Sequence, residues 1–408
     1  MARSPRRCAS LLAAALALLS ACGHRPPTIT PAAAPPPRVA PSYPSFADAM
    51  DDLDPVAARP LASTPPEARC ADALAAYLQG DWAVCLDALE GLRDAPAPLL
   101  ARARTLREMA FLQLAQWDRP TALDDPDLRA LVSVRRAAPP TSLALPPDGV
   151  ALPLTFSSAS IPVVTASLAG RPESLWLDTA ASLTVLSSDV AARAGVTPVS
   201  GPLTGTMGDS GSGTRLTVRL GTIARLGLGP AVAGSVTTAI ADQHDMQWKI
   251  LFVTLMKVDG ILGWNVLRDL DTTIDYPAAR LLLRPPAPAA GVRNLVWMER
   301  PLALASTMSG ASLHLVVDTG AARSYLTPRG AHKLGFSARP GDTLHEVSVL
   351  LTGQQITFAA LPVKTLRESV EVDGLLGNDV FRQGTLRLRP SSGQLDFSVP
   401  MDHPYKPG

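Results

Sequence analysis

Two aspartates occupy matching positions in a repeated stretch of this sequence. Asp178 ends the apolar run of LWLDTAASLTVL (175–186), and Asp318 ends that of LVVDTGAARSYL (315–326), at an offset of 140 in residue number. An acid in such a place is either a turn residue or a carboxylate that is held for chemistry. A turn explains one such acid, but not why both follow three apolar residues and precede the same kind of segment. Two neighbouring carboxyls cannot both ionise, so such a pair can divide the general-acid and general-base roles.

A second pair of blocks extends the repeat. VDGILGWNVLRDLDTTIDYPAARLLL (258–283) aligns with VDGLLGNDVFRQGTLRLRPSSGQLDF (372–397) at an offset of 114, against 140 for the first pair. The first copy therefore holds 26 additional residues, and we expect much of this excess near DQHDMQWKILFVTLM (242–256). Short apolar runs between Gly, Pro and Ser turns predict β-strands in both copies. We expect two homologous β lobes, at 148–287 and 288–402.

These repeats resemble the units of retropepsin-like (pepsin/retropepsin-type) aspartic proteases. The strand ends WLDTAAS and VVDTGAA resemble the active-site motif, and the apolar-apolar-Gly triplets that close with Gly263 and Gly377 resemble the ψ-loop. Two such pairs in one duplicated frame are a far more specific signal than a single Asp-Thr-Gly. The resemblance covers about residues 150–400. It implies the mainly β acid-protease fold, with two lobes related by a pseudo-twofold axis.

The resemblance also implies roles for the motif residues. Asp178 and Asp318 would face each other across the axis, titrate as one dyad and activate a water for peptide-bond hydrolysis. Thr179 and Thr319 would form the hydroxyl network beneath the dyad, although threonine is also an ordinary strand residue. The implied activity is therefore that of an aspartic endopeptidase.

Some motif positions depart from the family. After the Asp-Thr pair the family has glycine, which lets the backbone approach the substrate closely. The second lobe keeps it as Gly320, and the first lobe has Ala180 instead. Because alanine is the smallest intrusion, we expect Ala180 to reduce or narrow activity without abolishing it. Many retroviral members pair an acid at the fifth motif position with an arginine after the ψ-loop glycine. Both partners are replaced in both lobes, so no orphan charge is buried there. The residues at these positions are Ser182, Ala322, Trp264 and Asn378.

A glycine-rich hairpin resembles the mobile flap of the family. In LTGTMGDSGSGTRLTV (203–218), Gly208, Gly211 and Gly213 lie near the predicted tip, where glycine eases opening. Gly353 follows Gly213 at the same offset of 140 and is expected at the equivalent tip in the second lobe. A flexible surface turn is the simpler explanation for either tip.

Serine-protease and metal chemistry find little support. The stretch Gly208-Asp209-Ser210-Gly211 echoes the nucleophile motif of trypsin-like enzymes, but the only histidine upstream is His24. The six histidines are scattered, without a His-Glu-x-x-His or a Cys-x-x-Cys pattern. His314 is expected to pack on its strand or lie at the surface. We therefore expect no metal and no cofactor.

The first residues predict export. A basic start, MARSPRR, and a short apolar run, LLAAALALLSA, indicate a signal peptide at 1–21. LSAC (19–22) resembles the lipobox of bacterial lipoproteins, which implies lipidation of Cys22 and, because Gly23 follows, sorting to the outer membrane. An ordinary signal peptide with an incidental cysteine is the alternative. We expect a lipid-anchored protein on the periplasmic side or at the cell surface.

Two further segments precede the β lobes. Residues 22–66 are rich in Pro, Ala and Ser and predict a tether. Residues 67–140 have helical periodicity and contain one hairpin that resembles a tetratricopeptide unit. Because a single unit cannot build a solenoid, we expect a small helical cap or spacer. Cys70 and Cys85 lie in this hairpin, and the sequence leaves their pairing in a disulfide open.

Composition narrows the partners. With 37 basic and 36 acidic residues, the net charge is +1, and no basic surface for nucleic acid is predicted. Because one chain supplies both acids, we expect a monomer whose partner is a peptide or protein substrate. The leading hypothesis is a lipid-anchored aspartic endopeptidase. A peptide-binding protein without turnover and a scaffold that recruits a partner through its helices are the alternatives, and retention of both acids favours the enzyme.

Overall fold

A computed structural model represents this chain. It describes residues 25–32, 41–92, 95–119, 123, 125–207, 214–250, 253–288, 291–366 and 371–400. The expected signal peptide, Cys22 and the flap glycines Gly208, Gly211 and Gly213 lie outside the described residues. Among the described helices, none is long and apolar enough to cross a membrane.

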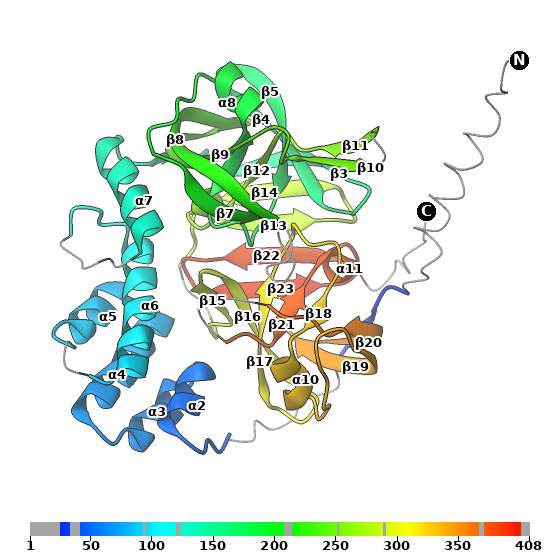
Figure 1. The fold of residues 1–408 in the computed structure, drawn as a ribbon. Coiled ribbons are helices and arrows are strands. Elements are labelled where there is room, and N and C mark those ends of the chain that lie inside the picture. Colours follow the sequence, from blue (N-terminus) through cyan, green and yellow to red (C-terminus); the bar gives the residue numbers. More distant parts are fainter. Residues whose placement is uncertain are drawn as a thin grey trace, which may run out of the picture.

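Two β lobes make up most of the molecule and lie one above the other in Figure 1. The strands of lobe 1 are β3 (Val150–Phe156), β4 (Pro162–Leu168), β5 (Arg171–Leu177), β6 (Thr184–Ser187), β7 (Leu203–Met207), β8 (Thr214–Leu228), β9 (Ala231–Ala241), β10 (Gln247–Ile250), β11 (Val253–Lys257), β12 (Gly260–Leu262), β13 (Asp271–Asp275) and β14 (Arg280–Arg284). The strands of lobe 2 are β15 (Leu295–Met298), β16 (Arg300–Thr307), β17 (Ser312–Val317), β18 (Tyr325–Leu326), β19 (Thr343–Leu351), β20 (Gln354–Pro362), β21 (Gly374–Leu376), β22 (Thr385–Arg389) and β23 (Gln394–Ser398). The mainly β, two-lobed fold that was predicted is confirmed.

Short helices occupy equivalent places in the two lobes. After the Asp-Thr loops come α8 (Ser188–Arg193) and α10 (Pro328–Lys333), and after the ψ-loop glycines come α9 (Trp264–Leu267) and α11 (Asn378–Phe381). Ser187 and Thr327 cap α8 and α10, each accepting a hydrogen bond from a first-turn N–H. In both lobes a strand therefore runs into a capped helix directly behind the loop that carries the aspartate.

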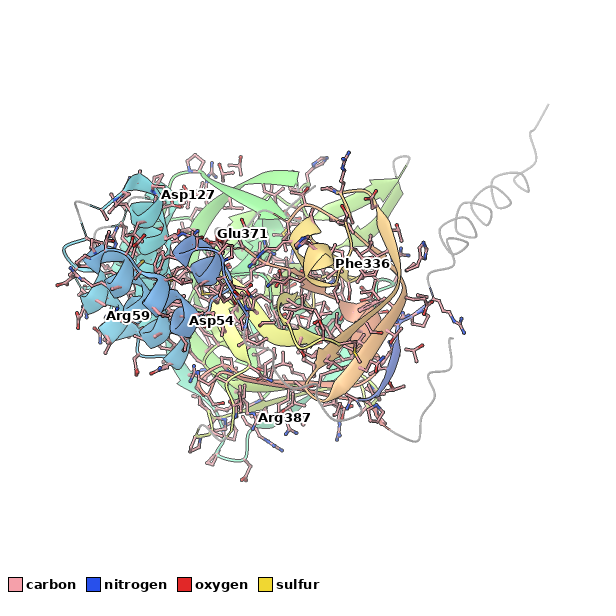
Figure 2. All side chains as sticks on the ribbon, turned by 90° about the horizontal axis from the view of Figure 1, so that it is seen from below. Asp54, Arg59, Asp127, Phe336, Glu371 and Arg387 are labelled. Atoms are coloured by element: carbon pink, nitrogen blue, oxygen red, sulfur yellow. The ribbon has the colours of Figure 1, made fainter. Side chains whose placement is uncertain are left out.

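The lobes meet in one antiparallel strand pair with symmetric register. Where β13 pairs with β22, Thr272 faces Leu388, Thr273 faces Arg387 and Ile274 faces Leu386. Residues 272 and 274 are equivalent to 386 and 388 by the offset of 114, so the register repeats itself about the Thr273–Arg387 pair. This pair marks one point on the pseudo-twofold axis, and Arg387 is labelled in Figure 2. β14 and β23 flank the central pair.

Alternating side chains of the strands form the lobe cores. Successive strand residues point to opposite faces, and in β3 the buried positions are Val150, Leu152 and Leu154. One continuous apolar cluster includes such residues from both lobes. Leu177 and Val317 belong to it, each fully buried one residue before an Asp-Thr motif. Each aspartate is thus anchored at the end of a strand that is fixed by its core.

Six helices precede the β lobes within the described residues and cover one side of the molecule (Figure 1). Their bounds are α2 (Phe46–Asp51), α3 (Pro55–Leu61), α4 (Pro65–Gln79), α5 (Trp82–Leu89), α6 (Ala97–Leu114) and α7 (Pro126–Ala137). We call α2–α7 the helical segment. Its apolar side chains share one cluster with the outer face of lobe 2, where Val316, Tyr325 and Leu375 are buried. Figure 2 shows the segment from below, with Asp54 and Arg59 on it, at the opposite side from Phe336 of lobe 2.

The predicted tether at 22–66 is wrong for most of its described length. β1 (Thr28–Pro31) pairs antiparallel with β20 of lobe 2, and α2 and α3 are capped by Ser45 and Asp54. An edge strand joins a sheet through backbone hydrogen bonds, so it needs no apolar periodicity. Helices of two turns contain too few repeats for a period to be read from sequence. In the helices that were predicted, Cys70 and Cys85 are fully buried free thiols.

The turn at Gly353 is not the counterpart of the lobe 1 flap, so that prediction is wrong. It joins β19 to β20, and β19 pairs with β16 as β8 pairs with β4. Beyond β20, Val363 bridges Leu326 in parallel, as β9 runs parallel to β6. Gly353 therefore corresponds to the β8–β9 turn at Gly229. Its offset from Gly213, equal to that of the two aspartates, is a coincidence.

The additional residues of lobe 1 lie in two hairpins. One is the β7–β8 hairpin, because no described strand of lobe 2 matches β7. The other is the β10–β11 hairpin, which falls on the stretch predicted to hold the excess. The duplication thus left lobe 2 without a described equivalent of the hairpin that resembles a flap.

Candidate active site

Asp178 and Asp318 lie on loops that the two lobes hold in the same way. Asp178 N–H donates to Leu262 O at 3.2 Å, and Asp318 N–H donates to Leu376 O at 3.0 Å. A backbone hydrogen bond therefore ties each loop to the residue before its ψ-loop glycine. In addition, Asp178 Oδ1 accepts from the N–H groups of the two alanines that follow Thr179, at 2.8 and 2.9 Å. Asp318 Oδ1 accepts from the Gly320 N–H at 2.8 Å.

Thr179 and Thr319 bind the two loops to each other through reciprocal hydrogen bonds. Thr179 N–H donates to Thr319 Oγ1 and Thr319 N–H donates to Thr179 Oγ1, both at 3.1 Å. Thr179 Oγ1 donates to Val317 O at 2.6 Å, and Thr319 Oγ1 donates to Leu177 O at 2.7 Å. Both threonines are fully buried. This symmetric set marks a second point on the pseudo-twofold axis, and it brings both aspartate loops to that axis.

The carboxyl of Asp178 lies against the loop of the other lobe. A Cβ built on Gly320 would lie 2.5 Å from Asp178 Cγ, closer than real Cβ atoms come. A side chain at position 320 would therefore displace the Asp178 carboxyl, so glycine suits this position. The equivalent residue in lobe 1 is Ala180, which carries a methyl group and is 7% exposed. The two sides of the site are thus not identical at this position.

Burial and mutual repulsion shift both carboxyls toward the protonated form. Burial, with the negative charge of Asp178 adding to it, raises the pKa of Asp318 to about 8. Burial also raises the pKa of Asp178. Arg300 and backbone N–H groups oppose both shifts. Two coupled carboxyls whose pKa values are both raised can hold one proton between them near neutral pH.

Arg300 approaches the pair from the start of β16. It follows Glu299, whose φ of +63° makes a tight turn between β15 and β16. Ser182 Oγ, three residues after Thr179, donates to Glu299 O at 3.1 Å. This bond ties the turn of lobe 2 to the aspartate loop of lobe 1. The motif comparison did not single out Arg300, because the contact joins segments that no sequence spacing relates.

A second set of polar residues supports the ψ-loops and was also missed from sequence. In lobe 1 the Gly263 N–H donates to Thr184 Oγ1 at 3.3 Å, and Thr184 donates to Asn265 Oδ1. In lobe 2 the Gly377 N–H donates to Ser324 Oγ at 3.0 Å, and Ser324 donates in turn to Asp379 Oδ1. Thr184 and Ser324 are related by the offset of 140, and Asn265 and Asp379 by the offset of 114. The same two offsets that revealed the aspartates could therefore have identified this set.

Both ψ-loop glycines are sterically required. A Cβ on Gly263 would lie 2.5 Å from the carbonyl carbon of Leu183, and one on Gly377 would lie 2.9 Å from Ala321 O. Both glycines have negative φ, so close approach explains them rather than a left-handed backbone. These are the positions at which the triplet motif predicted glycine.

The residues after the ψ-loop glycines differ in the side-chain hydrogen bonds that they make to the aspartate loops. Asn378 Nδ2 donates to Thr319 O at 2.7 Å and to Ala321 O at 2.9 Å, while its Oδ1 accepts from Tyr276 OH at 2.6 Å. The backbone contact is the same in both lobes, since Trp264 N–H donates to Ala181 O at 2.7 Å and Asn378 N–H donates to Ala321 O at 2.9 Å. Asn378 therefore supplies neutral donors at the position where retroviral members have arginine.

One cluster has the residue types of a metal site. Asp52, His314 and Asp373 each place a possible ligand atom within 4.8 Å of the others. Lys333 Nζ donates to Asp52 Oδ1 and, at 2.8 Å, to Asp373 Oδ2, and Arg329 pairs with Asp52 at 2.7 Å. Two side-chain cations already balance the two carboxylates, so the arrangement fits an ion-pair network. Burial lowers the pKa of His314 to about 4, which leaves it neutral near pH 7.

One comparison with known proteins covers most of lobe 1. Residues 164–266 match the family model described as aspartyl protease. Two solved structures are similar in outline: an aspartic proteinase from Irpex lacteus (12% identity, 64% of this chain and 98% of that one, TM-score 0.41) and basic 7S globulin from soybean (12% identity, 62% and 95%, TM-score 0.39). A comparison with curated proteins finds no match. With its two Asp-Thr loops joined at one axis and a family match across the first of them, the β region of this chain has the pepsin-like aspartic protease fold.

Proposed function

We propose that this protein is an aspartic endopeptidase in which Asp178 and Asp318 form one catalytic dyad. The observation that carries the proposal is the reciprocal pair of threonine hydrogen bonds, which holds both aspartate loops at the axis. A structural role alone does not require two buried, like-charged carboxyls at such a place, because their repulsion destabilises the fold. A shared proton between them is the feature that peptide hydrolysis uses.

The asymmetry of the pair assigns the two roles. Asp318 has the pKa raised to about 8, so it would donate a hydrogen bond to the substrate carbonyl as the protonated partner. Asp178 would act as general base on the attacking water. Arg300 would help to keep Asp178 ionised, since its charge lowers the pKa of that carboxyl. In the attack, Asp178 would take a proton from the water and Asp318 would give its proton to the carbonyl oxygen. When the tetrahedral intermediate collapses, Asp178 would give its proton to the leaving amine and Asp318 would take back the proton of the hydroxyl group.

The expected substrate is a peptide or protein segment that lies across the axis in an extended form. The β7–β8 hairpin of lobe 1 would close over it, and lobe 2 has no described hairpin of that kind. Because one chain supplies both aspartates, a monomer would be sufficient. We further propose export and lipid anchoring at Cys22 on the periplasmic side of the outer membrane or at the cell surface, on the strength of the signal-like start and the lipobox resemblance.

A peptide-binding protein with weak or absent turnover is the second candidate, and Ala180 is the observation that favours it. The glycine at the equivalent position of lobe 2 leaves no room for a methyl group beside Asp178. The methyl group of Ala180 occupies the equivalent place on the Asp318 side, where it would leave less room for the substrate. Binding with slow hydrolysis would follow if substrate cannot settle against Asp318.

The deciding experiment is cleavage of an unbiased peptide mixture, followed by mass spectrometry. The parent protein is expected to cleave at defined bonds, and a statine-type transition-state mimic is expected to block it. Asp178→Asn and Asp318→Asn should each lower turnover about 100- to 10,000-fold. Peptide affinity should change far less, and size-exclusion mass should be that of a monomer. Turnover that survives either substitution would exclude the dyad, whereas peptide binding without cleavage by the parent would select the second candidate.

A further inference from the structure

A small pocket lies where the helical segment meets both lobes. Its volume is about 30 Å³. The helical segment contributes residues of α4, α5 and α6, lobe 1 contributes Trp264, and lobe 2 contributes Arg293, residues 295–297 and Pro390. Figure 1 shows α6 running beside β15 at this seam. The walls are held together by a hydrogen bond from Tyr77 OH to Trp297 O, and by one of 2.9 Å from Arg268 to Leu112 O.

The side chains that line this pocket include four nitrogen donors without a hydrogen-bond acceptor. They are Trp264 Nε1, Trp297 Nε1, Gln113 Nε2 and Arg293 Nε, all buried. Trp264 is only 3% exposed. Among the buried side-chain oxygens of the described lining residues, none is left without a partner. Buried donors of this kind cost free energy unless something accepts from them.

Arg293 is held rigidly at the edge of this pocket. A Cβ on Gly393 would lie 2.7 Å from Arg293 Cζ, and one on Gly80 would lie 3.3 Å from Arg293 Nη2. The guanidinium is thus packed between the end of α4 and the β22–β23 turn, and both glycines have positive φ. Burial lowers the pKa of Arg293, with the charge of Asp81 opposing the shift. Within the described residues, Arg293 has no ion pair.

We propose that this pocket binds a carboxylate group, which accepts hydrogen bonds from Arg293, Trp264, Trp297 and Gln113. A carboxylate is an acceptor with about four lone-pair sites and no donor, so it matches four buried donors that lack an acceptor. Water matches less well, because one water molecule accepts only two hydrogen bonds, fewer than the four unpaired donors. The volume suits a small carboxylate head rather than a large anion.

The site is separate from the dyad but connected to its loop. Trp264, which lines the pocket with its ring, binds Ala181 O with its backbone N–H, next to the loop of Asp178. The carboxylate could belong to a small free acid or to the C-terminus of a peptide, since both present the same group. The binding itself does not depend on the proposed peptidase activity and can be tested without it.

The test uses thermal unfolding of the full chain in buffer without carboxylates, at constant ionic strength. Acetate is the first probe and acetamide, which has the same shape without the charge, is its control. N-acetylalanine and its amide form the second pair and report on peptide C-termini. We expect acetate or N-acetylalanine to raise Tm in a saturable way, as a ligand of the native state does, while the neutral partners do not. The probe that saturates at lower concentration identifies the source.

Two variants assign the binding to this pocket. Arg293→Gln should weaken carboxylate binding about tenfold or more, because it removes the charge-assisted bond. Arg280→Gln removes an exposed guanidinium on β14 and should leave binding unchanged. If Arg293→Gln does not fold by circular dichroism, Trp297→Phe, which keeps a ring and removes the N–H, takes its place. The proposal is overturned if neither carboxylate saturates, if chloride binds equally well, or if binding survives loss of these donors.

Discussion

Lobe 1 and lobe 2 keep the same supports around their aspartates and differ in what covers them. In both lobes the aspartate N–H donates to the carbonyl of the residue before a ψ-loop glycine. The N–H of that glycine donates to a hydroxyl at matching positions, Thr184 and Ser324. The outer face of lobe 1 is covered by its own hairpins and by α7 of the helical segment, whereas that of lobe 2 packs mainly against α2–α6. The aspartate loops and ψ-loops, which must be symmetric to bring two carboxyls together, have stayed so, while the outer faces of the lobes have diverged.

The ion pairs at equivalent positions show the same divergence. Arg193 of lobe 1 pairs with Glu173 at 2.9 Å and is 37% exposed. Its counterpart in lobe 2, Lys333, is 16% exposed and joins Asp373 to Asp52 of the helical segment. Burial alone would raise the pKa of Asp52, but the hydrogen bond and charge of Lys333 hold it below its ordinary value. At this position lobe 2 therefore has a partly buried lysine that links it to the helical segment, a contact we call the Lys333 joint.

The largest expected effect breaks this joint. Lys333→Met should lower the free energy of unfolding by about 3–5 kcal/mol, because it leaves two buried carboxylates with too little positive charge. Arg193→Met, the matched change in lobe 1, should cost less, since Arg193 is 37% exposed and water can take its place beside Glu173. Urea titrations followed by circular dichroism measure both. Equal losses in the two lobes would contradict the difference in burial.

The next comparison exchanges the residues that follow the two threonines. Gly320→Ala places a methyl against the Asp178 carboxyl and should lower kcat/KM about 10- to 100-fold, which corresponds to a displacement costing a few kcal/mol. Ala180→Gly restores the family motif in lobe 1 and should leave the fold intact, with kcat/KM unchanged or raised. Initial rates on one cleaved peptide give the ratio. A Gly320→Ala protein as active as its parent would show that the axis is not closely packed.

Much of this site was accessible from sequence because duplication repeats spacing. The offsets of 140 and 114 placed Asp178 and Asp318 on matching loops and predicted the ψ-loop glycines, which the structure shows to be sterically required. The same argument failed at Gly353, where an equal separation arose without a common strand order. Spacing is therefore reliable where it recurs across several residues and misleading for a single glycine.

Contacts between segments of unrelated origin could not be predicted in this way. Arg300 reaches the dyad from a turn of the opposite lobe, and Asp52 comes from a helix too short to show a period. β1 joins β20 through backbone bonds that carry no side-chain signature. In each case the partner is chosen by the folded arrangement, so the sequence alone holds no pattern to find.

The smallest expected effect concerns pH and separates the two aspartates from ordinary acids. Since the pKa of Asp318 is raised to about 8 in the folded chain and is near 4 when unfolded, the native state holds a proton that the unfolded chain has lost between these values. The dyad's contribution to stability therefore falls as pH rises from 5 to 8. Asp318→Asn removes this dependence and should raise the unfolding free energy at pH 8 by roughly 1 kcal/mol or more, relative to the parent.

The control is Asp396→Asn, an acid of lobe 2 that is 54% exposed and should leave the slope of stability against pH unchanged. Asp178→Asn should make the slope shallower without abolishing it, because burial, the larger cause of the raised Asp318 pKa, remains when the charge of Asp178 is removed. Urea midpoints at four pH values between 5 and 8 are sufficient. If both Asn variants keep the slope of the parent, the carboxyls do not share a proton and the two lobes do not meet at a common dyad. If only Asp318→Asn changes the slope, the charge of Asp178 does not affect the Asp318 pKa, and the lobes differ in the ionisation of their aspartates as well as in the segments that cover them.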